Sequence, residues 1–262
     1  MNDFYASSKP APLDQAHGLR RMFAGRRQAV LPLVANPFVA LSGVVLDRLA
    51  AVLAAAGQKV LVVDASAGSP PPHELAALDL AACIETVSKG VLYLPASGLP
   101  MTYVDTRGFA DGFIDALHRA APQVDVVLLH ADAQDLTRIF KRRAARPVLL
   151  GADHPDSIKH AYAGAKLLAT RCSLMTFDLL LAAAPDSPRL DSIAQSLAGC
   201  ADTFLGAAIC HVAVVDPAGE LHGDPDPSLN QLLAAQMSLD EAWAPAPQAT
   251  AQTAPAARTA FR

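Results

Sequence analysis

The sequence predicts an α/β fold with a doubly wound, mostly parallel sheet flanked by helices. From about residue 29 to residue 215, apolar runs rich in valine and leucine alternate with helical stretches. Continuous apolar strands between helices are typical of a parallel sheet that is covered on both faces. Hydrophobic residues make up 52% of the 262 residues and charged residues only 18%, which is enough apolar side chain for a substantial core.

The predicted strands and helices follow one another in regular order. Apolar runs predict strands over Ala29–Ala35, Val60–Asp64, Gly90–Leu94, Val124–His130 and Pro147–Leu150. Helical patterns predict helices over Leu41–Ala56, Gly108–Ala120, 133–144 and Ser157–Ala169. The alternation continues through Ser173–Leu181, Leu190–Gly199 and Ala207–Val215. A last helix is predicted over Ser228–Trp243, after a turn-rich break.

The two ends of the chain differ from the middle, and we expect three parts. Residues 1–28 form an N-terminal extension, in which Asp14 is suited to cap a short basic helix with Leu19 and Phe23 on its apolar face. Residues 29–243 form the α/β domain. Residues 244–262 consist mostly of Ala, Pro, Gln and Thr, so they are predicted to be disordered, because they bury too little apolar surface to offset the entropy of ordering.

Composition excludes several classes of function. The net charge of −4 gives no basic field for nucleic acid, and aromatic residues at 5% give no stacking platform for single strands. The four cysteines lie far apart and are predicted to be reduced core residues of a cytoplasmic protein.

Membrane association is also not expected. The uncharged stretch Gln28–Leu46 is interrupted by Pro32 and Pro37, which would break a helix exposed to lipid. The predicted helix Ser228–Trp243 carries only acidic charges, so it lacks the basic face that meets anionic lipids. We expect that helix to pack on the domain and the protein to have no strong membrane affinity of its own.

The loop after the first strand is where a doubly wound fold binds its ligand. A loop that binds phosphate needs glycines with bare amides, a lysine, and a serine or threonine for Mg²⁺. The segment Val34–Gly43 has no lysine and one glycine, and Pro37 removes an amide donor. The sequence therefore predicts no conventional ATP binding, and no cofactor or metal.

Three stretches of the chain carry a family pattern. Asp14-Gln15-Ala16-His17-Gly18-Leu19-Arg20-Arg21 matches a DQAxGLRR motif, Ala56–Ala65 is similar to a second strand that runs into switch I, and Asp153–Tyr162 with Lys166–Leu168 is similar to a D-x-P-x-S-I-x-x-A-Y…K-L-L helix. On these residues the chain resembles the MinD/ParA group of deviant P-loop ATPases, and within it the FlhG (FleN) family that controls flagellar number.

The departures from this family fall on the groups that handle nucleotide and metal. The family's loop GGKGGVGK[ST] aligns with Ala35–Gly43, so that Ala35 and Asn36 replace its first glycines, Pro37 its signature lysine, Ser42 its phosphate lysine and Gly43 its Mg²⁺ ligand. Switch I retains Asp64 but has Ser66 in place of the second aspartate, and the Walker B aspartate falls on His130, two residues before Asp132. The resemblance thus implies the fold of an ATPase without its hydrolytic cycle, a pseudo-ATPase with no catalytic residues of its own.

The resemblance also implies a partner. In the family, the N-terminal helix docks on FlhF, a GTPase related to those of the signal recognition particle, and stimulates its hydrolysis of GTP. The resemblance assigns the activating role to Gln15 and contacts with the partner to Asp14, Ala16, Leu19 and Arg20. A side-chain amide can orient an attacking water at a phosphoryl centre. We expect a cytoplasmic regulator that is recruited to the cell pole by its partner.

Other interpretations remain open. The N-terminal helix could be an ordinary capped helix that lies on its own domain, the chain could be a working ATPase with an atypical loop, or it could be a scaffold that binds a flagellar transcription activator or a C-ring component. His130 and Asp132 could form an acid–base pair at a strand end, although no nucleophile accompanies them. Cys210 and His211 are predicted to be core residues, and the spacing of His154 and His160 does not favour zinc.

Overall fold

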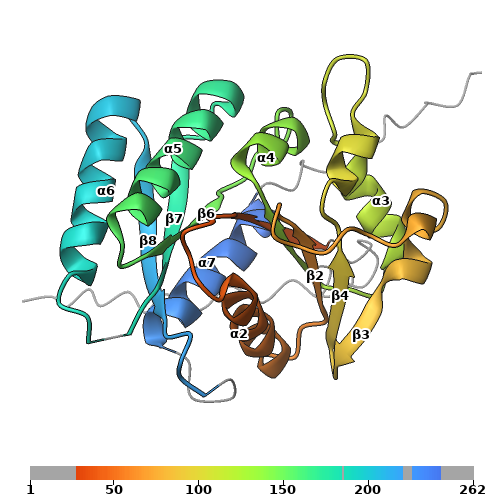
Figure 1. Ribbon diagram of the computed structural model, residues 1–262, viewed down its shortest axis with the longest axis horizontal. Coiled ribbons are helices and arrows are strands. Elements are labelled where there is room, and N and C mark those ends of the chain that lie inside the picture. The colour runs from red at the N-terminus through yellow and green to blue at the C-terminus, as the bar shows by residue number, and fades with distance from the viewer. Residues whose placement is uncertain (1–27, 185, 221–225, 243–262) are drawn as a thin grey trace, which may run out of the picture.

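A single mixed sheet forms the centre of the computed structural model, which describes residues 28–184, 186–220 and 226–242. The eight strands lie in the order β3-β4-β2-β5-β1-β6-β7-β8, and every neighbouring pair is parallel except β3–β4 (Figure 1). The strands are β1 (Ala29–Val34), β2 (Val60–Ala65), β3 (Glu85–Ser88), β4 (Val91–Pro95), β5 (Val126–Ala131), β6 (Val148–Ala152), β7 (Thr176–Ala182) and β8 (Ala208–Val215).

Helices cover both faces of this sheet. In Figure 1, α2 (Ser42–Ala55) and α7 (Pro227–Ala242) lie below it, and α3 (Gly112–Ala120), α4 (Ala133–Ile139), α5 (Pro155–Cys172) and α6 (Leu190–Leu205) lie above it. Short 3-10 helices connect strands on the β3 side: η1 (Glu74–Ala77), η2 (Ala81–Cys83) and η3 (Leu99–Tyr103). The predicted doubly wound α/β fold is confirmed.

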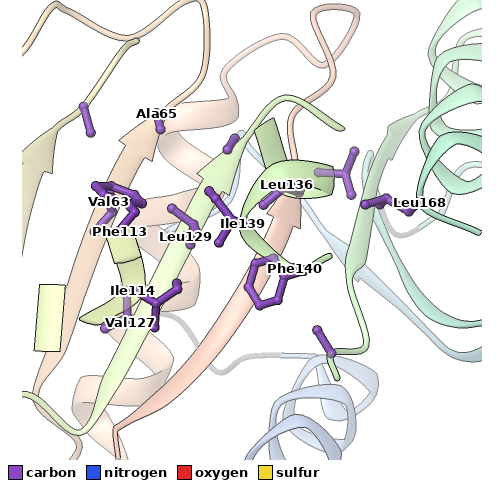
Figure 2. Packing of buried hydrophobic residues seen from close by; sticks show 14 of the residues in the cluster. Val63, Ala65, Phe113, Ile114, Val127, Leu129, Leu136, Ile139, Phe140 and Leu168 are labelled. Carbon is purple, nitrogen blue, oxygen red and sulfur yellow. The ribbon is translucent and has the colours of Figure 1, made fainter. Parts of the chain in front are cut away.

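Two apolar cores lie on opposite faces of the sheet. Figure 2 shows part of the larger one, in which side chains of β2 and β5 meet residues of α3, α4 and α5 such as Phe113, Leu136 and Leu168. The second core joins α2 and α7 to the other face and includes Leu229, Leu232 and Leu233. Burial of each large apolar side chain contributes about 1.5–3 kcal/mol, so the helices and the loops between them are held firmly on the sheet. The last helix packs on the domain as expected.

Several element boundaries differ from the sequence prediction. The predicted helix over Gly108–Ala120 begins at Gly112, because the carboxylate of Asp105 accepts hydrogen bonds from the backbone N–H groups of Arg107 (2.8 Å) and Phe109 (2.9 Å) and holds them in a turn. The predicted helix 133–144 ends at Ile139. Strand β3 was not predicted, since its four residues are all exposed and form no apolar run.

The prediction that the cysteines are core residues is wrong for two of them. All four are free thiols, but Cys200 and Cys210 are exposed. His211 is also not an apolar core residue, because its Nδ1 lies 3.0 Å from the carboxylate of the fully buried Asp178. Among the described residues, no helix is long and apolar enough to cross a bilayer. The predicted N-terminal helix and the tail 244–262 lie outside the described residues.

Candidate functional site

A cavity of about 630 Å³ opens where β1, β2 and β5 end. Because these neighbouring strands are parallel, the loops that follow them meet at one edge of the sheet, as expected for a ligand site in this type of fold. The first loop contributes Ala35, Asn36, Pro37, Val39 and Ser42, and the second contributes Ser66, Ala67 and Gly68. The end of β5, the start of α4 and one face of α5 complete the lining with His130, Asp132, Ala133, Gln134, His160, Ala163, Gly164 and Leu167.

Asn36 anchors the first loop. Its side chain is buried, and its Nδ2 donates to the carbonyl oxygens of Leu150 (2.8 Å) and Ser157 (2.9 Å). Its Oδ1 accepts from the backbone N–H of Phe38 at 3.1 Å. Buried polar groups without partners are costly, so this set of bonds fixes the loop to the middle of β6 and the first turn of α5. Phe38 then packs edge-on against the ring of His160, with ring centroids 5.9 Å apart.

The loop ends in an unusual backbone conformation. Leu41, immediately before α2, has φ 60 and ψ 34. This is the left-handed region, which glycine adopts far more readily than leucine. The left-handed conformation costs a residue with a Cβ about 1–2 kcal/mol. No side chain caps the start of α2, and its first turn contains no acidic residue. The loop thus keeps a backbone turn that suits glycine while presenting a leucine that is 62% exposed.

Substitution of Leu41 by glycine is expected to raise the free energy of unfolding by about 0.5 kcal/mol, because relief of the left-handed strain exceeds the entropic cost of glycine. The matched control is Leu78→Gly, at a residue that is 88% exposed but has φ −104. That change should lower the free energy of unfolding by about 0.5–1 kcal/mol. Urea unfolding of both variants measures the difference, and a stability loss in Leu41→Gly equal to that of the control would contradict the strain.

The ends of β2 and β5 bring Asp64 and His130 together. His130 Nδ1 lies 2.8 Å from Asp64 Oδ1, and the hydroxyl of Ser66 donates to the same oxygen at 2.8 Å. Burial opposes ionisation of Asp64, but the bonds from His130 and Ser66 outweigh it and lower the pKa of this carboxyl below its ordinary value. Asp64 is therefore ionised at neutral pH, and its charge is already engaged within the protein.

His130 and Asp132 have different environments. The ring of His130 is buried, and its Nε2 has no hydrogen-bond partner among the described residues. Burial, followed by the nearby charge of Asp135, raises the pKa of Asp132 above its ordinary value. The lining of the cavity includes two imidazole rings, those of His130 and His160, and the carboxyl group of Asp132. No residue of its lining is a lysine or arginine in the part of the chain that the structure describes.

The predicted site residues fall in two places. Ala35, Asn36, Pro37 and Ser42 line the cavity, Gly43 lies in the first turn of α2, and Asp64 lies behind the lining, against His130. The partner-binding residues Asp14, Gln15, Ala16, Leu19 and Arg20 lie outside the described residues. His160 lines the cavity, His154 precedes α5, and no cluster of three or more potential metal ligands occurs among the residues described.

Sequence reasoning missed two residues that shape the cavity. Ser157 is fully buried, and its hydroxyl accepts from the backbone N–H of Ala152 at 2.9 Å beside the amide of Asn36. His160 lies three residues further along α5 and supports Phe38. Ser157 is the serine of the D-x-P-x-S stretch, so the motif marks it. The residue that it contacts, Asn36, is 121 residues away in sequence.

Comparison with solved structures places the fold among MinD/ParA-type proteins. A putative plasmid partition protein from Borrelia burgdorferi B31, bound to AMPPNP, has a TM-score of 0.55 at 8% identity, with 82% of this chain and 100% of that chain covered. The MinD cell division protein of Aquifex aeolicus has a TM-score of 0.51 at 13% identity, with 83% and 99% covered. A ParA family ATPase from Chlorobium tepidum TLS has a TM-score of 0.50 at 16% identity, with 83% and 93% covered.

No protein-family model matches the sequence, and no curated protein sequence matches it either. At identities this low, the structural likeness shows the fold alone. The chain therefore has the fold of MinD/ParA P-loop ATPases, and its cavity occupies the edge of the sheet where the first loop of that fold lies.

Proposed function

We propose that this chain is a non-hydrolysing, MinD-like regulator of flagellar number or placement, which binds and stimulates the GTPase FlhF through its N-terminal helix. One contrast carries the proposal: the motif Asp14–Arg21 is complete, whereas the loop Ala35–Gly43 has no lysine and borders a cavity without a cation among its described residues. A triphosphate carries several negative charges, so a cavity of this composition is poorly suited to hold one.

The state of the cavity supports the same proposal. The side chain of Asn36 is committed to Leu150 and Ser157, and the only carboxylate retained from the family's switch I, Asp64, is bonded to His130 and Ser66. The amide nitrogen of Asn36 and the Oδ1 atom of Asp64 are therefore already bonded within the protein. The domain would then act as a support that presents the N-terminal helix, in the cytoplasm and at the cell pole when a partner recruits it.

Deletion of residues 1–28 is expected to abolish binding to FlhF, because the proposal places every essential contact in that segment. The measurement is a pull-down of FlhF with the full chain and with the shortened chain, after thermal unfolding has shown that both are folded. The shortened chain starts beside β1, whose six residues all pair with β5 and remain intact. Retention of FlhF by the shortened chain would contradict the proposed docking helix.

Two other functions predict different outcomes. A scaffold that binds a flagellar transcription activator or a C-ring component through its flanking helices would capture those proteins with or without residues 1–28. A working ATPase with an atypical loop is favoured by one observation, the uncapped start of α2, since free amides at a helix start attract anions. The Borrelia burgdorferi neighbour is bound to AMPPNP. Nucleotide titration separates this alternative from the other two.

A further inference from the structure

A groove runs along the seam between α4 and α5, from the cavity at the strand ends toward the C-terminal end of α5. A second cavity of about 510 Å³ is lined by Gly108, Phe109, Gln134, Thr137, Arg138, Lys141, Leu167 and Arg171. It shares Gln134 and Leu167 with the cavity beside Asn36, so the two spaces adjoin. We call them together the α4–α5 groove.

The spacing of the lining residues shows that the groove follows the helices. On α5, His160, Gly164, Leu167 and Arg171 recur at intervals of three or four residues and therefore share one face. Eleven residues separate His160 from Arg171, which corresponds to about 16 Å along a helix. An extended peptide of about five residues has this length.

The end of the groove that lies far from Asn36 is basic. Arg138, Lys141 and Arg171 line it, and only Arg138 has a carboxylate partner there, Asp135 at 2.7 Å. Lys141 donates to the backbone carbonyl of Arg171. Within the described ranges, no carboxylate lies within ion-pair distance of Lys141 or Arg171. These cations are opposite in sign to the net charge of −4 of the whole chain.

Two large apolar side chains, Phe109 and Leu167, lie among the polar residues of this lining. Leu167 and Phe109 are partly buried, and the guanidinium of Arg142 lies over the ring of Phe109, 5.8 Å from its centroid. Because that ring is covered, it offers little face for stacking a nucleic-acid base. The groove is also recessed between helices, whereas a surface that inserts into a membrane presents its apolar residues outward.

We propose that the α4–α5 groove binds an extended acidic segment of a partner protein, with an apolar side chain along Leu167 and carboxylates at Lys141 and Arg171. Charge complementarity at such a site steers binding and fixes the direction of the peptide. This surface belongs to the domain and not to residues 1–28, so it adds a second contact to the proposed function and does not depend on FlhF.

The test uses random peptides displayed on phage and selected on the full chain, followed by fluorescence anisotropy with the enriched peptides. We expect enriched peptides that contain several Asp or Glu residues around an apolar residue, with affinity that falls as salt rises. The double variant Lys141→Glu with Arg171→Glu should bind them at least about tenfold more weakly, since each carboxylate would then meet a like charge.

The matched control is Lys89→Glu with Arg119→Glu, which makes the same charge change at two exposed residues outside the groove. It should leave peptide affinity unchanged. The single variant Arg171→Gln is a milder test, and it applies if the double variant unfolds at a lower temperature than the control. No enrichment, enrichment of neutral or basic peptides, or equal loss in both double variants would overturn the proposal. The proposal would also be overturned if no acidic peptide were selected and the protein instead bound phosphatidylglycerol vesicles through Lys141 and Arg171.

Discussion

Replacing Gln15 by alanine is expected to remove the stimulation of FlhF by this protein while leaving the two proteins bound. In the proposed function the amide of Gln15 orients the attacking water; for comparison, an arginine supplied to a GTPase site contributes about 10³–10⁵ in rate. Alanine is the strongest helix former, so the substitution is compatible with the proposed helix and with the proposed contacts of Leu19 and Arg20. Phosphate release by FlhF should fall by about tenfold or more, toward its unstimulated rate.

The control for this experiment is Gln123→Ala, which removes an exposed glutamine of the domain. This variant should raise the rate of GTP hydrolysis by FlhF to the same extent as the unchanged protein. A pull-down under the same conditions shows whether Gln15→Ala still binds. Equal stimulation by Gln15→Ala and the unchanged protein would contradict the activating role of Gln15.

Removal of the carboxylate of Asp178 is expected to give the largest loss of stability. Asp178 is fully buried on β7 and accepts hydrogen bonds from Arg146 Nε (3.0 Å), Gln236 Nε2 (2.7 Å) and the backbone N–H of His211 (3.1 Å). Gln236 also donates to the carbonyl of Arg146 at 2.8 Å, so this cluster connects α7 to the start of β6. Asp178→Ala leaves the guanidinium of Arg146, only 10% exposed, without its counter-ion.

We expect Asp178→Ala to lower the free energy of unfolding by about 3–5 kcal/mol, the usual cost of breaking a buried ion pair from one side. The control is Asp115→Ala, which removes the partner of Arg143 from an ion pair of 2.6 Å whose carboxylate is 53% exposed. Exposed pairs contribute about 0–1 kcal/mol. Urea unfolding compares the two, and similar small losses would mean that Asp178 does not hold α7 on the sheet.

The sequence predicts the parts of the fold that carry a repeating apolar pattern. The runs over β1, β2 and β5 consist almost entirely of valine, leucine and alanine, and their positions agree with the structure within one or two residues. Strand β3 has no such run, and it pairs only through its backbone with β4 at the edge of the sheet. The turn held by Asp105 shows a second limit, since a local side-chain bond shortened a helix that the apolar spacing alone favoured.

The geometry of the cavity depends on contacts between distant residues, which a single sequence does not reveal. Asn36 meets Leu150 and Ser157, which are 114 and 121 residues away, and His130 meets Asp64 across 66 residues. The loop could be identified as the position of a ligand site, and its lack of lysine was visible. Only the folded chain shows that the side chain of Asn36 is buried and that His130 lies within hydrogen-bond distance of Asp64.

Whether the cavity beside Asn36 binds a nucleoside triphosphate is tested most directly by calorimetric titration of the full chain with ATP and Mg²⁺. The residues that line it predict no binding at micromolar concentrations and a dissociation constant of about 1 mM or weaker. A micromolar dissociation constant, with phosphates located along Asn36–Gly43 in a crystal grown with the nucleotide, would contradict that prediction and would identify the chain as a working ATPase.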